Sequence, residues 1–374
     1  MSSINEILDQ HELSKQDILR LLSITDKAEQ DALIQKAYSI KASAIGTKVY
    51  LRGLIEFSNQ CRKNCYYCGI RSGNKKVIRY SMADEEILQV VELAKKNQFT
   101  GIVLQGGEIQ SPEFTNRITG LLIKIKKATH PDFRITLSLG EQSLETYQQW
   151  HNAGAQRYLL RIETSREELY QKIHPDNALH RYNTRLECLK NIQKTGYQTG
   201  TGVMIGLPYQ SIENLADDSL FIKHMDIDMV GMGPYLEHAD TPLYHHKDLL
   251  LSKMDRLNLS LRMIAVLRIL MPTINIASTT ALQSIVPFGR ELGLKAGANV
   301  IMPNLTPAKY KSQYLLYENK PCLEEQADEC IDCLANKVSM TGEEVAFNDY
   351  GDSRHFMKKH GAWGKEHGMS SRKV

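Results

Sequence analysis

The sequence predicts an α/β protein with a complete (β/α)8 barrel of the TIM type. Three observations support this: eight short apolar runs recur over about 260 residues, amphipathic helix-like runs separate them, and Gly-rich or polar turns follow them. Such alternation indicates a parallel sheet, and eight repeats favour a closed barrel over an open, doubly wound sheet. The expected strands are 49–58, 101–107, 134–140, 157–164, 199–206, 229–235, 275–281 and 299–304.

The segments around and between these strands complete the expected organisation. A helical leader, residues 1–45, precedes the barrel at 46–317, and a cysteine-containing extension follows at 318–374. The run "ADEEILQVVELAKKN" is typical of the connecting helices, because its apolar residues recur at helical spacing. Acidic residues open this run and lysines close it, which suits the helix dipole.

Composition and charge narrow the function classes. The 46 basic and 43 acidic residues leave a net charge of +3, too balanced to indicate a nucleic-acid partner. The N-terminus lacks a signal-peptide pattern, and no run of 18 apolar residues predicts a membrane span. We therefore expect a cytoplasmic protein, in which seven cysteines indicate metal or catalytic chemistry instead of disulfides.

Three of these cysteines lie close together just after the first expected strand. Cys61, Cys65 and Cys68 occur in "SNQCRKNCYYCGIR" without a nearby fourth thiol or imidazole. Structural zinc sites usually have four protein ligands, whereas an iron–sulfur cube can be held by three thiolates. The iron left open would accept a bidentate ligand such as an amino-acid head group. A zinc site with a distant fourth ligand is the alternative.

Polar residues at the ends of the second and third strands are candidates for ligand binding. Gly106 and Gly107 allow the backbone to approach a ligand closely, and Glu108 follows them. An ordinary strand-to-helix turn is the alternative for this motif. Thr136 and Ser138 alternate on the third strand, so both are expected to face inward and could bind a carboxylate or ribose. They could equally form a polar layer of the barrel.

Charged residues also share one face of the fourth strand. In "RYLLRIET", Arg157, Leu159, Arg161 and Glu163 alternate with apolar residues that face the other way. Buried charges without partners are costly, so these arginines and this glutamate should be paired inside the barrel.

The cysteine motif resembles that of the radical S-adenosylmethionine (SAM) superfamily, C-x3-C-x2-C with an aromatic residue, here Tyr67, before the last cysteine. "TLSLGE", "AGAQRYLLRIET", "MIGLPYQSIENLADD" and "STTALQSIVPFGRE" further resemble the [FeFe]-hydrogenase maturase HydE family, over most of residues 5–335. The resemblance implies a site-differentiated [4Fe–4S] cluster and SAM, which yield a 5′-deoxyadenosyl radical. Biotin synthase and methylornithine synthase are similar more distantly.

The resemblance also implies roles for individual residues. The GGE motif would line the methionine amino group, Glu163 would bind the ribose or amino group, and Arg161 would lie near the substrate. Arg185, on the expected helix "YNTRLECL", would contact the cofactor carboxylate, although a solvated face is the alternative. The cofactor-binding set is Tyr67, Gly106, Gly107, Glu108, Thr136, Ser138, Arg161, Glu163 and Arg185, and the substrate-binding set is Met229, Thr279, Thr280, Arg290, Met302, Tyr310 and Tyr314.

Several residues of the substrate set have a plain structural alternative. Methionines and tyrosines at such positions often pack in the core, and Arg290 could cap a helix instead of holding a carboxylate. Cys188, alone on an amphipathic run, is read as core packing. The cysteines of the extension, Cys322, Cys330 and Cys333, reproduce the C-x7-C-x2-C spacing of an optional second cluster in the resembling family, [4Fe–4S] or [2Fe–2S], with zinc as the alternative.

The function that the resemblance implies is hydrogenase maturation. Its substrate would be a cysteine-bound iron carbonyl cyanide, whose sulfur the adenosyl radical would attack, and its partners would be companion maturases and a flavodoxin or ferredoxin electron donor. The residues themselves indicate only a barrel mouth suited to a small, charged, amino-acid-like ligand. Two alternatives are a biotin- or methylornithine-synthase-like enzyme acting on a small amino acid, and a non-enzymatic zinc-binding scaffold.

Overall fold

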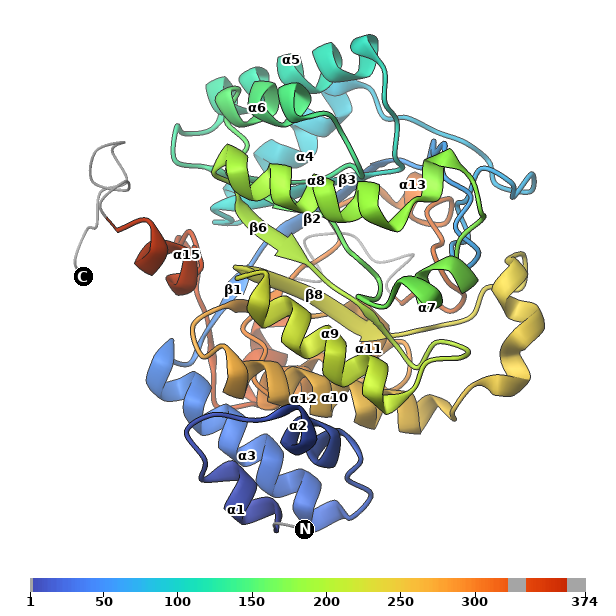
Figure 1. Ribbon diagram of the computed structural model, residues 1–374. Coiled ribbons are helices and arrows are strands. Elements are labelled where there is room, and N and C mark those ends of the chain that lie inside the picture. Colours follow the sequence, from blue (N-terminus) through green and yellow to red (C-terminus); the bar gives the residue numbers. More distant parts are fainter. Residues whose placement is uncertain (1–2, 322–333, 362–374) are drawn as a thin grey trace.

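The computed structural model describes residues 3–321 and 334–361, and a parallel sheet forms the centre of this part of the chain (Figure 1). The sheet follows the order β11-β1-β10-β9-β8-β6-β5-β4-β3-β2, and β7 pairs with β8. This confirms the predicted class of parallel α/β fold. The strands are β1 (Lys48–Leu51), β2 (Gly53–Ser58), β3 (Gly101–Gly106), β4 (Arg134–Ser138), β5 (Arg157–Leu159), β6 (Gln198–Thr201), β7 (Met204–Ile205), β8 (Met229–Pro234), β9 (Asn275–Ser278), β10 (Val300–Ile301) and β11 (Glu344–Val345).

The first predicted strand, 49–58, is divided at Arg52 into β1 and β2. β1 pairs with β10, and β2 pairs with β3. These two strands follow one another in the chain but lie near opposite ends of the strand order. The backbone also joins β2 directly to the segment after β10, through the parallel bridge between Leu54 and Asn304.

Two other predicted strands are shorter or divided in the structure. β5 ends at Leu159, five residues before the predicted end, and Glu163 beyond it has a φ of +67° that a regular strand does not allow. The predicted strand 199–206 is divided into β6 and β7 around Gly202. A Cβ at Gly202 would lie 1.9 Å from the Gly231 carbonyl oxygen, so only glycine permits this approach of neighbouring backbones.

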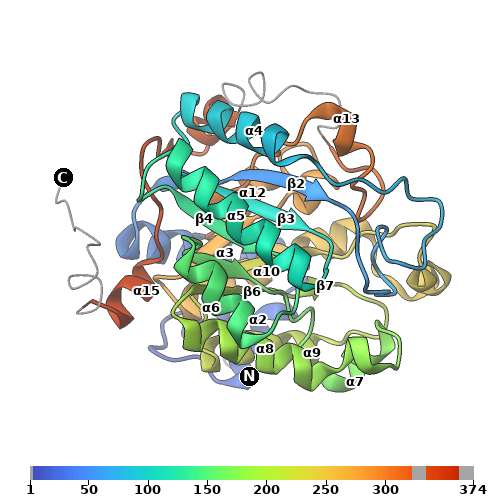
Figure 2. The same cartoon turned by 90° about the horizontal axis from the view of Figure 1, so that it is seen from above.

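Helices cover the outside of the sheet, as Figures 1 and 2 show. Three helices precede the first strand, and α3 packs against α10 while α2 packs against α9. The helices are α1 (Ile4–Leu8), α2 (Lys15–Leu22), α3 (Lys27–Ala44), α4 (Asp84–Lys96), α5 (Pro112–Ala128), α6 (Leu144–Asn152), α7 (Glu167–Lys172), α8 (Tyr182–Thr195), α9 (Ile212–His224), α10 (Lys253–Leu270), α11 (Thr280–Gln283), α12 (Gly289–Lys295), α13 (Ala308–Lys311) and α15 (Arg354–Lys359), with 3-10 turns at Ala178–His180 and Pro242–Leu249.

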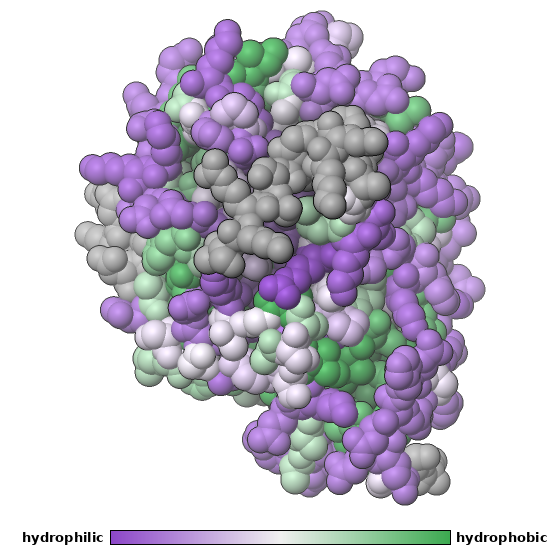
Figure 3. All heavy atoms as spheres, turned by 90° about the vertical axis from the view of Figure 1, so that its left-hand side faces the viewer, coloured by the Kyte–Doolittle hydropathy of each residue, from purple (hydrophilic) through white to green (hydrophobic). Residues whose placement is uncertain are grey.

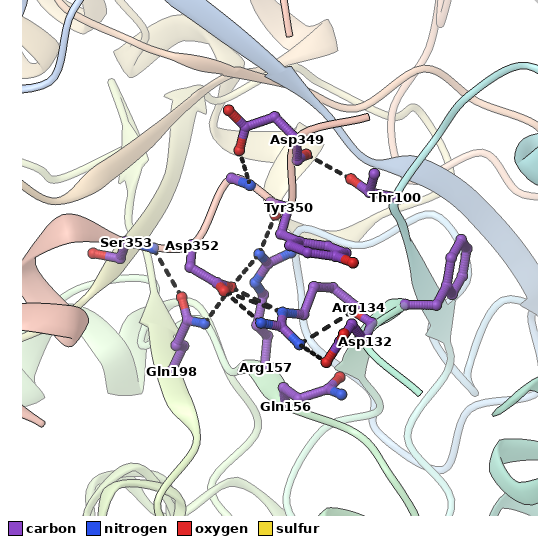
Figure 4. A network of polar contacts seen from close by, with 12 residues as sticks. Thr100, Asp132, Arg134, Gln156, Arg157, Gln198, Asp349, Tyr350, Asp352 and Ser353 are labelled. Carbon is purple, nitrogen blue, oxygen red and sulfur yellow. Dashed lines mark hydrogen bonds and ion pairs between the residues drawn. The ribbon is translucent and has the colours of Figure 1, made fainter. Parts of the chain in front are cut away.

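Residues 349–353 of the extension lie across the N-terminal ends of β4, β5 and β6, at an end of the barrel that we call the floor (Figure 4). We predicted no strand in this region, but β11 pairs with β1, and residues 349–353 then run beneath the sheet. The Asp352 carboxylate accepts hydrogen bonds from Arg134 (Nη2, 2.8 Å), Arg157 (Nη2, 2.6 Å) and Gln198 (Nε2, 2.6 Å), which begin β4, β5 and β6. The floor is therefore tied to three consecutive strands by one carboxylate.

The outer surface agrees with a helix-covered sheet. The face in Figure 3 is mostly hydrophilic, with smaller apolar patches between the polar residues. In the stretches that the structure describes, no helix combines the length and apolar character needed to cross a membrane.

Candidate active site

The predicted cluster cysteines lie on the loop that leaves β2, at the end of the barrel opposite the floor. Cys65 is buried, and Cys61 and Cys68 are partly exposed. The GGE turn after β3 packs against this loop: a Cβ at Gly107 would lie 2.7 Å from the Cys61 Cβ, and the Glu108 N–H donates to Cys61 Sγ at 3.3 Å. The structure therefore brings the cysteine motif and the GGE motif together, and Gly107 is required for their contact.

Burial raises the pKa of all three thiols above the usual range. It raises the pKa of Cys65 to about 12, with the charge of Arg185 opposing it, and raises the pKa of Cys68 well above its usual range. Neighbouring thiols add to the increase, because two thiolates would repel one another. Without a cation these groups are thiols, and a positively charged metal centre would stabilise their thiolate forms.

A buried cluster of four charges connects the cysteine loop to the ends of β3 and β4. Lys63 Nζ lies 2.7 Å from Glu141 Oε2 and 3.2 Å from Glu108 Oε1, and Arg185 Nε on α8 lies 2.9 Å from Glu141 Oε1. Glu108 Oε2 also accepts from the Glu141 N–H at 3.0 Å. Two cations and two carboxylates balance, so the Glu108 side chain is already engaged and Arg185 is paired inside the protein.

The segment beyond β5 places the predicted pair Arg161 and Glu163 side by side. Arg161 Nη2 lies 3.0 Å from Glu163 Oε2 and donates to the Val203 carbonyl at 2.9 Å. Glu163 is buried with a left-handed backbone, which is costly for a residue other than glycine and is characteristic of functional sites. The expectation that these inward charges are paired is met here, and Asp352 pairs with Arg157 at the floor.

Tyr67 contacts His174, which follows α7. Its hydroxyl lies 3.3 Å from His174 Nε2, and the two rings meet edge to face at 5.3 Å between centroids. Burial raises the pKa of Tyr67 well above its usual range, so the hydroxyl is neutral. Tyr67 thus attaches the cysteine loop to the region after α7.

A cavity inside the barrel is lined by three of the predicted residues, Thr136, Met229 and Met302. The Thr136 hydroxyl is buried, and no hydrogen-bond partner for it exists among residues 3–321 and 334–361. Arg52 also lines the cavity, where its Nη1 donates to Met229 Sδ at 3.2 Å and its Nη2 donates to the Gly351 carbonyl at 3.3 Å. The remaining lining residues are Val103, Leu159, Val230, Gly231, Asn275, Ala277 and Val300.

The other predicted substrate residues are distributed around the late strands. Arg290 Nη2 donates to Thr280 Oγ1 at 2.9 Å, and Thr279 Oγ1 donates to the Met232 carbonyl at 3.2 Å. Tyr314 is buried and accepts from Gln105 at 3.3 Å. Tyr310 stands apart from them on α13, where its ring stacks on Tyr80 at 4.6 Å and its hydroxyl donates to Glu86 of α4.

The remaining predicted residues are two at strand ends, one core cysteine and the three cysteines of the extension. Ser138 ends β4, is half-buried and lies in register with Gln105, and Gly106 ends β3 in register with Ser58. Cys188 is buried and donates to the Gln142 carbonyl at 3.5 Å, in agreement with core packing. Cys322, Cys330 and Cys333 lie outside the described residues.

Sequence reasoning missed four residues of the site, Lys63, Glu141, Arg52 and Asn275. Lys63 lies between two motif cysteines and Glu141 follows the turn "LSLG", so their position beside the motifs was a usable signal. Arg52 and Asn275 occur within or at the start of strands, where an isolated polar residue could have indicated an inward-facing site. Their partner, the Gly351 carbonyl, comes from the extension and has no sequence signal.

The comparisons with known proteins first define a class. The family model of the Radical SAM superfamily matches residues 55–222, which include the cysteine loop, the GGE turn and strands β3 to β7. This chain is a radical SAM enzyme.

The relatives narrow the class to one family. The chain is 44% identical over 340 residues to the [FeFe] hydrogenase maturase subunit HydE of Thermotoga maritima, covering 91% of this chain and 94% of that protein. The chain therefore belongs to the HydE family. It is also 28% identical to the 3-methylornithine synthase of Methanosarcina acetivorans, over 91% of this chain and 93% of that protein.

Solved structures agree on the fold. The crystal structure of methylornithine synthase (PylB) matches with a TM-score of 0.76 and 25% identity, covering 92% of this chain and 97% of that one. The crystal structure of HydG, a maturase of the [FeFe]-hydrogenase, matches with a TM-score of 0.78 at 18% identity, over 96% of this chain and 80% of that one, which supports the fold alone.

The residues present fit the [4Fe–4S] cluster and SAM that the family implies. Three cysteines share one loop, a backbone N–H already donates to one of their sulfurs, and Gly107 allows the GGE turn to pack directly against the loop. In the described stretches, no three His, Cys, Asp or Glu side chains converge as ligands of a single ion do. The thiolates that hold a cube of iron and sulfide need not converge on one point, since each thiolate binds a different iron.

Proposed function

We propose that this chain acts in hydrogenase maturation on a cysteine-bound iron carbonyl cyanide, a precursor of the di-iron subsite. The observation that carries the proposal is 44% identity to a HydE protein along 91% of the chain. When bound, the cluster and SAM supply a 5′-deoxyadenosyl radical. The residues of this chain then have to hold both groups, orient the substrate and exclude water.

Binding of the cofactors is assigned to the mouth of the barrel. Cys61, Cys65 and Cys68 would hold three irons of the cluster and leave the fourth open for the methionine group. Because Lys63 and the Glu141 N–H already engage the Glu108 side chain, the backbone of the GGE turn is the better candidate to accept from the methionine ammonium. The remaining cofactor contacts of the proposal are Tyr67, Ser138, Arg161, Glu163 and Arg185. Thr136, predicted together with them, lines the interior cavity, so we propose it as a substrate contact instead.

Substrate binding is assigned to the barrel interior. The cavity is lined mainly by apolar side chains, which exclude water from a reactive radical. Thr136 contributes an unpartnered hydroxyl, and Met229 and Met302 contribute polarisable sulfurs. Thr279, Thr280, Arg290, Tyr310 and Tyr314 complete the proposed set, although Tyr310 would have to leave Glu86 to reach a ligand.

We further propose that the sheet closes into a complete eight-fold barrel, with 1–45, 46–317 and 318–374 as leader, barrel and extension. Pairing of β1 with β10 and of β2 with β3 supports closure, because β1 and β2 are separated by Arg52 alone. The C-x7-C-x2-C spacing of Cys322, Cys330 and Cys333 supports a second [4Fe–4S] or [2Fe–2S] cluster. The proposed partners are the companion maturases and a flavodoxin or ferredoxin.

A second candidate is an enzyme of the methylornithine-synthase kind that acts on a small organic amino acid. The PylB match, with a TM-score of 0.76 over 92% of the chain, favours it. Both candidates need the same mouth and differ in what fills the cavity. A genome without an [FeFe]-hydrogenase and its other maturases would support this second candidate.

The discriminating experiment compares substrates with one preparation. The full chain is reconstituted anaerobically with iron and sulfide, reduced, and given SAM with either a cysteine-ligated iron carbonyl cyanide complex or free amino acids. We expect 5′-deoxyadenosine formation to be stimulated by the organometallic complex. Stimulation by an amino acid, with that amino acid converted, would favour the second candidate. Zinc bound in equal amount to protein, without iron uptake, would eliminate both.

A further inference from the structure

The cysteine loop is a closed loop whose two ends meet. Residues Ser58 and Ser81 form an antiparallel bridge at its base. Just inside this bridge, the Asn59 N–H donates to the Tyr80 carbonyl at 3.3 Å, and the Tyr80 N–H donates to Asn59 Oδ1 at 2.8 Å. All three motif cysteines lie between these ends, so the path of this one loop determines where their sulfurs stand.

Arg79, near the end of this loop, binds backbone carbonyls on both sides of the cysteines. Its Nη1 donates to the carbonyls of Asn59 (2.7 Å) and Ile70 (2.6 Å), and its Nη2 donates to those of Arg71 (2.6 Å) and Asn74 (3.2 Å). One acceptor precedes the first cysteine and three follow the last. The half-buried guanidinium thus spans the segment that carries the thiols.

These four acceptors all belong to the loop itself. Arg79 therefore ties the loop to itself and contributes little to the attachment between the loop and the barrel. Other residues supply that attachment: the Tyr66 N–H donates to the Ile173 carbonyl at 3.0 Å and the Gly69 N–H to the Leu316 carbonyl at 2.9 Å. Loss of Arg79 should consequently alter the shape of the loop and leave the barrel folded.

We propose that Arg79 is a positioning residue that holds the cysteine loop in the shape required to take up the cluster, an inference that rests on the proposed role of Cys61, Cys65 and Cys68 as cluster ligands. Three thiolates must reach three corners of one rigid cube, so a loop with several alternative shapes would bind it slowly and weakly. The planar fork of arginine can serve four carbonyls at once, whereas a lysine ammonium in the same place has only three donors at one point.

The test uses the full chain with Cys322, Cys330 and Cys333 replaced by alanine, so that only the first cluster forms. Arg79→Gln and Arg79→Lys are reconstituted anaerobically with iron and sulfide, and iron content, the rate of uptake and the low-temperature EPR spectrum of the reduced cluster are measured. We expect cluster uptake by Arg79→Gln to be about 10-fold slower or weaker, as for other residues that orient metal ligands. Arg79→Lys should recover only part of the loss.

The melting temperature of the cluster-free protein separates positioning from folding. It should change little in Arg79→Gln. The matched control is Arg262→Gln, another half-buried arginine that donates to a backbone carbonyl, that of Ile24, at 2.7 Å, but lies on α10. This control should take up iron normally.

Three results would overturn the inference or its premise. Normal uptake and an unchanged EPR spectrum in Arg79→Gln would show that the hydrogen bonds of Arg79 are dispensable for cluster uptake. A fall in melting temperature as large as the loss of iron uptake, with Arg79→Lys equally unstable, would make Arg79 a folding residue. If the parent protein itself takes up no iron, the proposed function is wrong, which is a separate outcome from failure of Arg79 alone.

Discussion

The two ends of the barrel are built from the same strands and both contain paired buried charges, but the mouth also carries the three motif cysteines. At the floor, Arg134 and Arg157 converge on the carboxylate of Asp352, which comes from a segment some 200 residues away (Figure 4). At the mouth, buried cations and carboxylates surround three thiols, and Glu163 has a strained backbone. The mouth therefore differs from the floor in holding three thiols suited to a metal centre, and the interior holds the Thr136 hydroxyl, which has no partner among the described residues.

This contrast predicts that substitutions at the mouth remove chemistry and substitutions at the floor remove stability. Strain and unpartnered polar groups persist in folded proteins when function requires them. For paired charges in a dry region, in contrast, the loss of one partner is strongly destabilising, because it leaves an uncompensated buried charge. The predictions below separate these two behaviours, beginning with the largest expected effect.

Cys65→Ala tests the mouth. It removes one of three cluster ligands, so we expect no detectable 5′-deoxyadenosine from reductant and SAM, with the fold intact. Product is measured by chromatography and folding by circular dichroism. Cys188→Ala is the control, because Cys188 is buried in the core and should be dispensable for turnover. Product from Cys65→Ala would contradict the ligand assignment.

Asp352→Ala tests the floor. Removing one partner from a buried ion-pair network leaves two arginines without their carboxylate, which should lower the free energy of unfolding by about 3–5 kcal/mol. The measurement is denaturant unfolding, and the folded fraction should still bind its cluster. Asp349→Ala, in the same segment but more exposed, should cost much less. Loss of cluster binding in folded Asp352→Ala would show that the floor also affects the cluster site, contrary to this prediction.

The floor also shows what the sequence could not predict. Apolar alternation locates the strands, since burial on both faces of a parallel sheet demands it, and the cysteine spacing locates the mouth. The contact between Asp352 and Arg157 joins residues 195 positions apart. No local pattern encodes such a contact, so the arginine was predicted to need a partner but the partner could not be named.

At the mouth the residue types could be predicted from the sequence, but their ion-pair and hydrogen-bond partners could not. The strand-end glycines and Glu108 could be identified from the turn after β3, but the structure pairs the Glu108 carboxylate with Lys63. The division of the first strand at Arg52 was also missed. A polar residue inside an apolar run does not reveal whether the chain begins to hydrogen-bond to a different neighbouring strand there. Tyr310 lies against α4 because its ring stacks on Tyr80, a contact that depends on the path of the cysteine loop.

The pH dependence of stability sharpens the comparison. Burial alone would raise the pKa of Asp352, but the charges of Arg157 and Arg134 outweigh it and hold the pKa well below its usual range. Between the native pKa and the ordinary aspartate value near about 4, the unfolded chain binds a proton that the native protein does not. Stability from this group is therefore complete above about pH 5 and lost as the pH falls.

The matched variant for this effect is Asp352→Asn, which cannot ionise. The difference in free energy of unfolding between wild type and Asp352→Asn should be largest near pH 7 and should shrink from about pH 5 to pH 3. Denaturant unfolding at each pH measures it. A difference that stays constant across this range would mean that hydrogen bonding, and not charge, accounts for the contribution of Asp352.

The smallest expected effect concerns Thr136, in the interior between the two ends. Its buried hydroxyl has no partner among the described residues, so Thr136→Val, which keeps the shape, should raise the free energy of unfolding of the ligand-free protein by about 1 kcal/mol. If the hydroxyl is retained for a ligand, the same variant should weaken substrate-stimulated 5′-deoxyadenosine formation while basal cofactor cleavage continues. Ser219→Ala on α9, which removes a buried hydroxyl that donates to the Leu215 carbonyl at 2.9 Å and has no proposed ligand, controls for loss of a hydroxyl. A Thr136→Val protein that is less stable, with unchanged stimulation, would place Thr136 with the structural residues of the floor.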